Sequence, residues 1–107
     1  MKAYEMEELN ASCIYNAINC ARAFMVFSDE QRHDILGQCI SDSARDYVEI
    51  ATYEAYGEVD QNLTNNILNI IGSMVEMNPS ISDASIIDTL NKCGICLVGQ
   101  RYQWGKR

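Results

Sequence analysis

The sequence has little of the residue types that mark disordered, membrane-spanning or secreted chains. Its 107 residues include one proline and six glycines, too few for a disordered or low-complexity chain. Apolar runs are short, as at Phe24–Phe27 and Ile95–Val98, whereas a transmembrane helix needs about 20 apolar residues. The first ten residues are acidic, where a signal peptide would be basic and then apolar. We therefore expect a single soluble domain over residues 1–107, located in the cytoplasm and not in a membrane.

Residue patterns that carry catalysis are also missing. The only histidine, His33, lies between Arg32 and Asp34, and no serine or cysteine stands in a recognisable nucleophile motif. No segment has the spacing of a nucleotide-binding loop. Paired carboxylates of the glycosidase kind stay open, because the two partners can come from any part of a fold. We expect a protein that is not an enzyme and that uses no cofactor.

The cysteines are five in number, and this odd count without a secretion signal predicts reduced thiols. Cys93 and Cys96 form a C-x-x-C pair, a spacing used by zinc ligands and by redox disulfides. The pair follows a predicted helix at a glycine, whereas a thioredoxin-like pair opens a helix, and a four-ligand zinc site would need a second close pair. We therefore predict no metal site, and keep a zinc or redox module built on these two cysteines as an alternative function.

Bases are scarce and unevenly distributed. The net charge is −7, and residues 1–92 hold all fifteen acids against five bases, a net charge of −10. Residues 93–107 hold three bases and no acid, a net charge of +3. Because binding to a phosphate backbone depends on lysine and arginine, the acidic body is not expected to bind nucleic acid directly. A protein partner with a basic, nucleic-acid-binding surface fits this charge better. The alternative is that acidity only keeps a small protein soluble.

Hydrophobic periodicity predicts an all-α protein, a compact single-domain bundle of four to five helices. Ser28 and Gln31 form a capping box that starts the second helix. Ser41 offers a further N-cap, which predicts either a break into two segments or a kink near residue 41. Near Ile95, a short extended segment and one more helical turn both stay open. The predicted helices lie near residues 5–27, 29–56, 60–77 and 83–93. Further boundaries are predicted at Gly57, Asp60, Asn78-Pro79, Ser82 and Gly94.

The predicted core-facing residues repeat at spacings of three and four. In the first helix they are Met6, Leu9, Cys13, Ala17, Cys20, Phe24 and Phe27, widened by Ile14, Ile18, Ala21 and Met25. In the second they are Leu36, Ile40, Ala44, Tyr47, Ala51 and Ala55. In the third and fourth they are Leu63, Ile67, Ile70, Ile71, Met74 and Val75, and then Ile86, Ile87 and Leu90.

The second predicted helix also carries a candidate partner-binding face. A solvated face would need only the charged residues, which are mostly exposed in any soluble protein, and this is the alternative interpretation. The tyrosines go beyond that need, so we expect the partner contact here. The candidate residues are Asp42, Asp46, Glu49 and Tyr53, which share one side of the helix, with Glu54 and Tyr56 close by.

Residues 99–107 form a predicted tail in which bases and aromatic rings are interleaved. Its candidate contact residues are Arg101, Tyr102 and Trp104. This composition is used for stacking on single-stranded nucleic acid or for anchoring in a protein groove. Three other interpretations stay open: the tail is frayed, Trp104 covers the core, or the bases dock on the acidic surface of a second copy and make a homodimer.

Functions from three different classes are compatible with these features. The first is a small acidic helical module for protein–protein interaction. Its inhibitor form would be a phage-type anti-defence or anti-CRISPR protein that presents carboxylates to a nucleic-acid-binding surface. The second is a structural or regulatory helical homo-oligomer, which an overly apolar third helix would favour. The third is the zinc or redox module. We expect the first, because the chain is small and acidic and has no catalytic motif.

Overall fold

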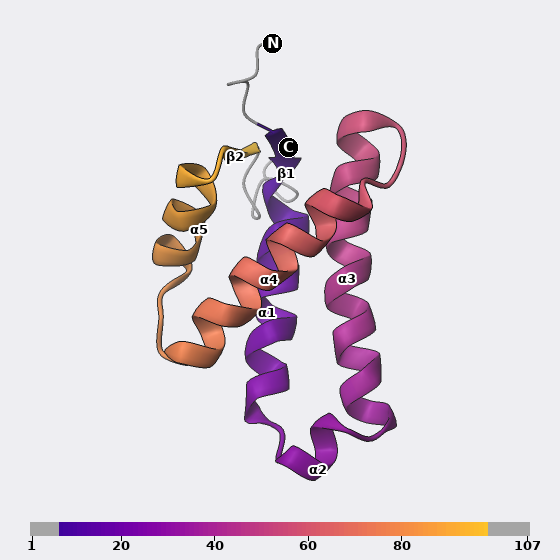
Figure 1. The fold of residues 1–107 in the computed structure, drawn as a ribbon, viewed down its shortest axis with the longest axis vertical. Coiled ribbons are helices and arrows are strands. Elements are labelled where there is room, and N and C mark those ends of the chain that lie inside the picture. The colour runs from indigo at the N-terminus through magenta and orange to yellow at the C-terminus, as the bar shows by residue number, and fades with distance from the viewer. Residues whose placement is uncertain (1–6, 99–107) are drawn as a thin grey trace, which may run out of the picture.

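Five helices and two short strands make up residues 7–98, the part of the chain that the computed structural model describes (Figure 1). The predicted all-α bundle is confirmed, since helices supply nearly all of the secondary structure. In chain order the elements are β1 (Glu7–Asn10), α1 (Ala11–Val26), α2 (Asp29–Arg32), α3 (Ile35–Tyr56), α4 (Gln61–Met77), α5 (Asp83–Lys92) and β2 (Ile95–Val98).

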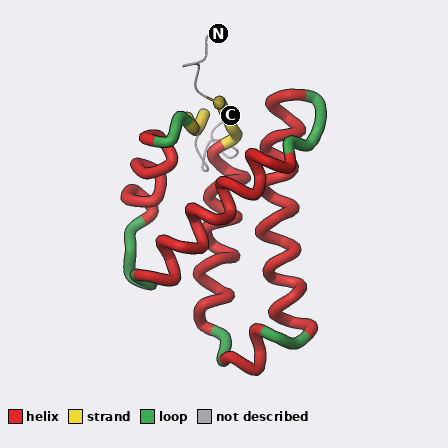
Figure 2. Tube along the Cα trace, in the orientation of Figure 1, coloured by secondary structure: helices red, strands yellow, loops and turns green. Residues whose placement is uncertain are grey.

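The long helices α1 and α3 lie side by side and run in opposite directions, with the short α2 joining them at one end (Figure 1). α4 crosses both of them, and a loop leads from it to α5 (Figure 2). β1 and β2 lie together at the end of the bundle opposite α2. α1 is the central element, because it contacts α3, α4 and both strands.

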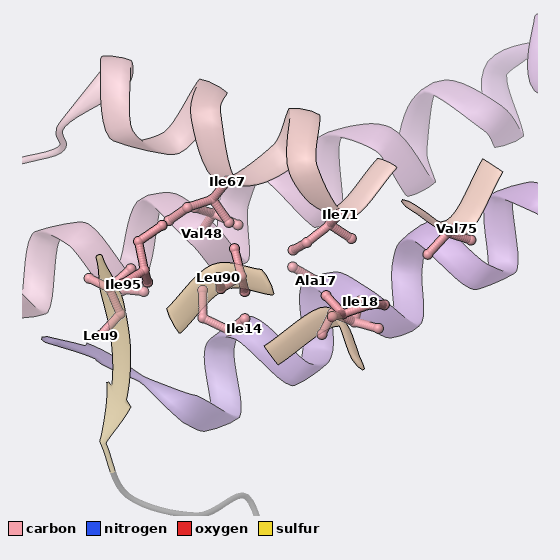
Figure 3. Packing of buried hydrophobic residues seen from close by; sticks show 12 residues of the cluster. Leu9, Ile14, Ala17, Ile18, Val48, Ile67, Ile71, Val75, Leu90 and Ile95 are labelled. Carbon is pink, nitrogen blue, oxygen red and sulfur yellow. The ribbon is translucent and has the colours of Figure 1, made fainter. Parts of the chain in front are cut away.

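The core lies between α1, α3, α4 and α5, and Figure 3 shows Ile71 of α4 facing Ala17 of α1. The stripes predicted for the third and fourth helices are confirmed, because all of their apolar residues belong to the core or pack against it. In α1, Ile14 and Ile18 are fully buried while the two cysteines of the predicted stripe are half-buried. Ala17 of the predicted stripe is fully buried as well, so the core-facing side of α1 is centred on Ile14, Ala17 and Ile18, of which the two isoleucines were expected only to widen it.

The helix predicted near residues 5–27 starts later than expected. The chain first forms β1, which pairs in parallel with β2 along its whole length. The segment near Ile95 is thus extended. α1 begins at Ala11, and the Asn10 side chain caps it by accepting a hydrogen bond from the Ser12 backbone N–H at 2.8 Å. Helical periodicity could not reveal β1, because its partner strand comes from the other end of the described chain.

The predicted break near Ser41 is wrong, because α3 continues through that residue. The chain breaks earlier, between α2 and α3. There the Asp34 side chain accepts hydrogen bonds from the backbone N–H groups of Leu36 and Gly37, at 2.9 and 3.2 Å. Asp34 is therefore the N-cap of α3. A serine inside a helix is no cap when the packing of neighbouring elements keeps the helix continuous.

Arg32 holds the end of α1 against the start of α3. Its guanidinium donates hydrogen bonds to the backbone carbonyl oxygens of Phe24 and Met25, at 3.1 and 3.0 Å. These carbonyls belong to the last turn of α1, where helix geometry leaves acceptors without partners. Gly37 packs so close to the Arg32 backbone that a Cβ would overlap the Arg32 carbonyl oxygen. The corner between α2 and α3 therefore requires a glycine.

The core-facing side of α3 differs from the predicted stripe. Val48, Ala51 and Thr52 are fully buried, whereas Leu36 and Ala55 are exposed. The other three predicted residues are half-buried. The stripe is thus confirmed at Ala51 and at Tyr47, which packs against the core, and wrong at Leu36 and Ala55. Both of the exposed residues lie near the ends of the helix, beyond the neighbours that cover its middle.

The remaining helix boundaries agree with the predicted caps. In the capping box, the Ser28 hydroxyl accepts from the Gln31 N–H at 3.2 Å and the Gln31 side chain accepts from the Ser28 N–H at 2.9 Å. Gly57 ends α3 with a φ of 80°, a left-handed conformation that glycine adopts without strain. Asp60 and Ser82 cap α4 and α5, and α4 ends just before the predicted Asn-Pro stop. These signals are local, which is why the sequence reveals them.

Two buried threonines allow a matched test of hydrogen bonding in the core. The Thr52 hydroxyl accepts from the Asp60 backbone N–H at 3.1 Å and donates to the Glu49 carbonyl at 2.9 Å. The Thr64 hydroxyl is buried and has no hydrogen-bond partner within residues 7–98. Thr52→Val should lower the free energy of unfolding by about 1–3 kcal/mol, because the Asp60 N–H loses its acceptor. Thr64→Val should be neutral or stabilising by up to about 1 kcal/mol. Urea denaturation measures both, and equal losses would contradict this assignment.

Candidate interaction surface

Acidic and aromatic side chains gather on the side of α3 that faces away from the core. Residues three and four apart share one side of a helix, and the structure thereby brings together five of the six predicted partner-binding residues. Tyr53 and Tyr56 keep 58% and 45% of their surface exposed. Asp42 and Asp46 are also exposed, and Glu49 is half-buried.

Ile50 belongs to the same side and is a residue that sequence reasoning missed. It is 46% exposed and lies four residues from Asp46 and three from Tyr53. That spacing was the available signal, since Ile50 also falls outside the predicted core stripe. In the loop after α3, Val59 adds a second apolar side chain that is 40% exposed. The outer face of α3 is defined here as Asp42, Asp46, Glu49, Ile50, Tyr53 and Tyr56.

Glu54, the sixth predicted partner-binding residue, lies at the edge of the outer face of α3, four residues from Ile50, and is exposed. It is offset from Tyr53 by about a quarter of a turn, and its Oε1 accepts a hydrogen bond from Asn10 Nδ2 at 3.2 Å. Burial first, and then the negative charge of Glu54, raise the pKa of the Cys13 thiol. Glu54 therefore joins α3 to the start of α1 while remaining exposed.

Two glutamines position carboxylates of the outer face of α3. Gln38 Nε2 donates to Asp42 Oδ1 at 2.9 Å, one turn along the same helix. Gln61 Nε2 of α4 donates to Glu49 Oε2 at 3.2 Å and so bridges two helices. An ionised carboxylate can accept about four hydrogen bonds. Both acids are thus held in place and still have acceptor sites for the donors of a partner.

A shallow hollow adjoins the outer face of α3 where the chain turns into α4. Glu58 supplies a carboxylate to it, while Tyr56 and Val59 supply apolar surface. This combination suits a lysine or arginine, whose stem packs on apolar surface while its charge meets an acid or an aromatic ring. The hollow has a volume of about 550 Å³ and is lined by Tyr56, Glu58, Val59, Asp60, Gln61 and Asn62.

The cysteines and the histidine are dispersed over the fold, and exposed Cys39 of α3 lies three residues before Asp42. Within residues 7–98, no three side chains of His, Cys, Asp or Glu are grouped so that they could hold a metal ion. Cys93 is exposed at the end of α5, and Cys96 is half-buried in β2, both as thiols. Burial raises the pKa of the Cys20 thiol, so less of it is the reactive thiolate at neutral pH. His33 is exposed, with Nδ1 2.7 Å from the Asp29 carbonyl oxygen.

Arg101, Tyr102 and Trp104, the predicted contact residues of the tail, lie outside the described residues. Among the helices of residues 7–98, none combines the length and the hydropathy that crossing a bilayer requires. Comparison with protein families, with curated proteins and with solved structures finds no match.

Proposed function

We propose that the protein binds a basic surface of another protein through the outer face of α3, and that it thereby blocks a surface that binds nucleic acid. The observation that carries this proposal is the mixture of exposed apolar and acidic groups on one helix side, with Ile50, Tyr53 and Tyr56 beside Asp46 and Glu49. A side that only had to be solvated would carry the charges without the rings. The proposed activity is binding, with no reaction catalysed and no cofactor used.

The carboxylates of the outer face of α3 support the choice of partner. At a rise of 1.5 Å per residue, Asp42 and Asp46 are offset by about 6 Å along the helix axis, and Asp46 and Glu49 by about 4.5 Å. One strand of duplex DNA carries a charge about every 3.4 Å along its axis. A row of three acids therefore approaches the charge density of a short stretch of nucleic-acid backbone. Lysines and arginines that bind phosphates would find acceptors here.

Tyr53 is the proposed anchor of the contact. Exposed ion pairs contribute only about 0–1 kcal/mol each, so the carboxylates alone would give weak binding. Tyrosine is among the residues that most often dominate the energy of an interface, because its ring buries a large area at a small cost in side-chain entropy. Tyr53 is the more exposed of the two tyrosines of the outer face of α3, and Ile50 and Glu49 lie within one turn of it.

The small size of the chain and its net charge of −7 support an inhibitor as the form of this function. A small acidic protein that occupies the nucleic-acid channel of a larger one prevents binding by competition. An anti-defence or anti-CRISPR protein of a phage is a protein of this kind. The proposal therefore extends to that class, with a nucleic-acid-binding component of a host defence system as the partner.

Crosslinking from the outer face of α3 tests the proposal. A photoreactive amino acid in place of Ile50 leaves both tyrosines and all the acids intact, and should capture a protein that binds nucleic acid when purified. The matched control carries the same group at Met77, which is 85% exposed on α4 outside the outer face of α3. The control should not capture that protein. Equal capture from both positions, or a captured protein without affinity for nucleic acid, would count against the proposal.

A further inference from the structure

A cleft of about 770 Å³ is lined mainly by residues of α1, α3 and α4, whose arrangement Figure 1 shows. Arg32 of α2 lines it as well. Its volume is within the range of small-molecule sites, about 300–1,000 Å³. Asp42 is the one residue of the outer face of α3 that also lines this cleft. The cleft, called the α1–α3 cleft below, is thus a separate feature of the described part of the chain.

Small residues leave the α1–α3 cleft open where the three helices face one another. Ala21 of α1, Ala44 of α3 and Gly72 of α4 all line it, and a Cβ on Gly72 would meet open space. Larger apolar side chains line it as well, and these are Phe24, Met25, Leu68, Ile71 and Val75. An alkyl chain placed against these side chains would leave water for an apolar surface, which is favourable.

The charged part of the lining is basic where it is more buried. Arg32 and Arg45 are half-buried, whereas the two acids of the lining, Asp42 and Glu76, are exposed. Residues 7–98 contain four arginines and lysines, so two in one cleft is a high local concentration for this acidic chain. Arg45 makes one long hydrogen bond, 3.4 Å to Gln61 Oε1. A guanidinium has five N–H donors, so Arg45 can also bind an anion.

We propose that the α1–α3 cleft binds an amphipathic anion, a carboxylate with an unbranched alkyl chain. The alkyl chain lies against Phe24, Met25 and Leu68. The carboxylate accepts two parallel hydrogen bonds from the Arg45 guanidinium, a geometry that suits both groups. A cation with the same chain would instead approach the Arg45 guanidinium and be repelled, whereas the Arg32 guanidinium is already paired with Asp29 at 3.2 Å. This binding function goes beyond the contact made by the outer face of α3 and does not depend on it.

Titration of the full chain with octanoate, decanoate and dodecanoate, each below its micelle concentration, tests the proposal. Calorimetry gives the Kd, and NMR shifts of the Leu68 and Val75 methyl groups give the location. Each step of two methylenes should tighten the Kd by roughly tenfold, because each methylene leaves water for the apolar walls. Decyltrimethylammonium, with the alkyl chain length of decanoate, should bind at least about tenfold more weakly than decanoate.

Variants of the cleft sharpen the test. Arg45→Gln should weaken the binding of decanoate about tenfold and should leave the affinity for decyltrimethylammonium no lower than in the wild type. Ala44→Phe fills the α1–α3 cleft and should abolish binding, whereas Ala55→Phe, the same change at an exposed position of α3, should bind like the wild type. Circular dichroism shows whether Ala44→Phe folds. If it does not, the affinity of Arg45→Gln for decanoate decides whether the proposal holds. No binding of decanoate, equal binding of cation and anion, or unchanged affinity in Arg45→Gln would overturn the proposal.

Discussion

Replacing Ile71 with alanine is expected to lower the free energy of unfolding by about 2–5 kcal/mol. Ile71 is 1% exposed, and in Figure 3 it points from α4 toward Ala17 of α1. α4 crosses both long helices, so the cavity left by the substitution cannot close unless α4 moves against them. A domain of this size has a stability of about 5–15 kcal/mol, so the loss would be a large fraction of the total.

Ile35→Ala is the matched control for that prediction. It removes the same atoms at a position that is 81% exposed, and should change the free energy of unfolding by less than about 0.5 kcal/mol. Urea denaturation followed by far-ultraviolet circular dichroism measures both variants. A loss as small for Ile71→Ala as for Ile35→Ala would mean that α4 does not pack on the core as described.

Gly37→Ala is expected to destabilise the protein by about 1–3 kcal/mol, although alanine is the better helix former. Alanine gains up to about 1 kcal/mol over glycine inside a helix. At Gly37 this gain is outweighed, because the new Cβ would overlap the Arg32 carbonyl oxygen and a backbone atom cannot rotate away. The corner between α2 and α3 would have to open.

Gly72→Ala provides the comparison, since it is the same substitution in α4, where a Cβ would meet open space. It should raise the free energy of unfolding by up to about 1 kcal/mol, the full gain in helix propensity. The two glycine variants should therefore shift the urea midpoint in opposite directions. Shifts in the same direction would show that the close approach of Gly37 to Arg32 does not limit stability.

The parts of the fold that the sequence could reveal depend on residues close together in the chain. The Ser28 capping box, the Asp60 cap and the stripe around Ile71 involve neighbours within one or two turns, and all are confirmed. β1 depends on pairing with β2 from the far end of the described chain, which no local pattern shows. The break at Asp34 instead of Ser41 depends on how α2 packs against α3, and this is also a tertiary effect.

The candidate surface follows the same division. Helical spacing alone was sufficient to place Asp42, Asp46 and Tyr53 on one side of α3. The hydrogen bond between Glu54 and Asn10 could not be predicted, because it depends on where α1 starts. The α1–α3 cleft could not be predicted at all, since its alanines and Gly72 come from three helices whose relative placement only the fold determines.

Competition with nucleic acid is the most direct test of the claim that the outer face of α3 occupies a nucleic-acid-binding surface. The protein captured from position 50 is purified with a labelled oligonucleotide bound, and the wild-type chain should displace the oligonucleotide. A variant with Asp46→Lys and Glu49→Lys should displace the oligonucleotide only at a concentration at least about 100-fold higher. The new lysines would face the basic surface of the partner, and like charges repel. The control variant carries Glu76→Lys in α4 and Asp88→Lys in α5, so its net charge equals that of the outer-face variant. It should displace the oligonucleotide like the wild type. Undiminished displacement by the outer-face variant, or simultaneous binding of the chain and the oligonucleotide, would contradict the claim.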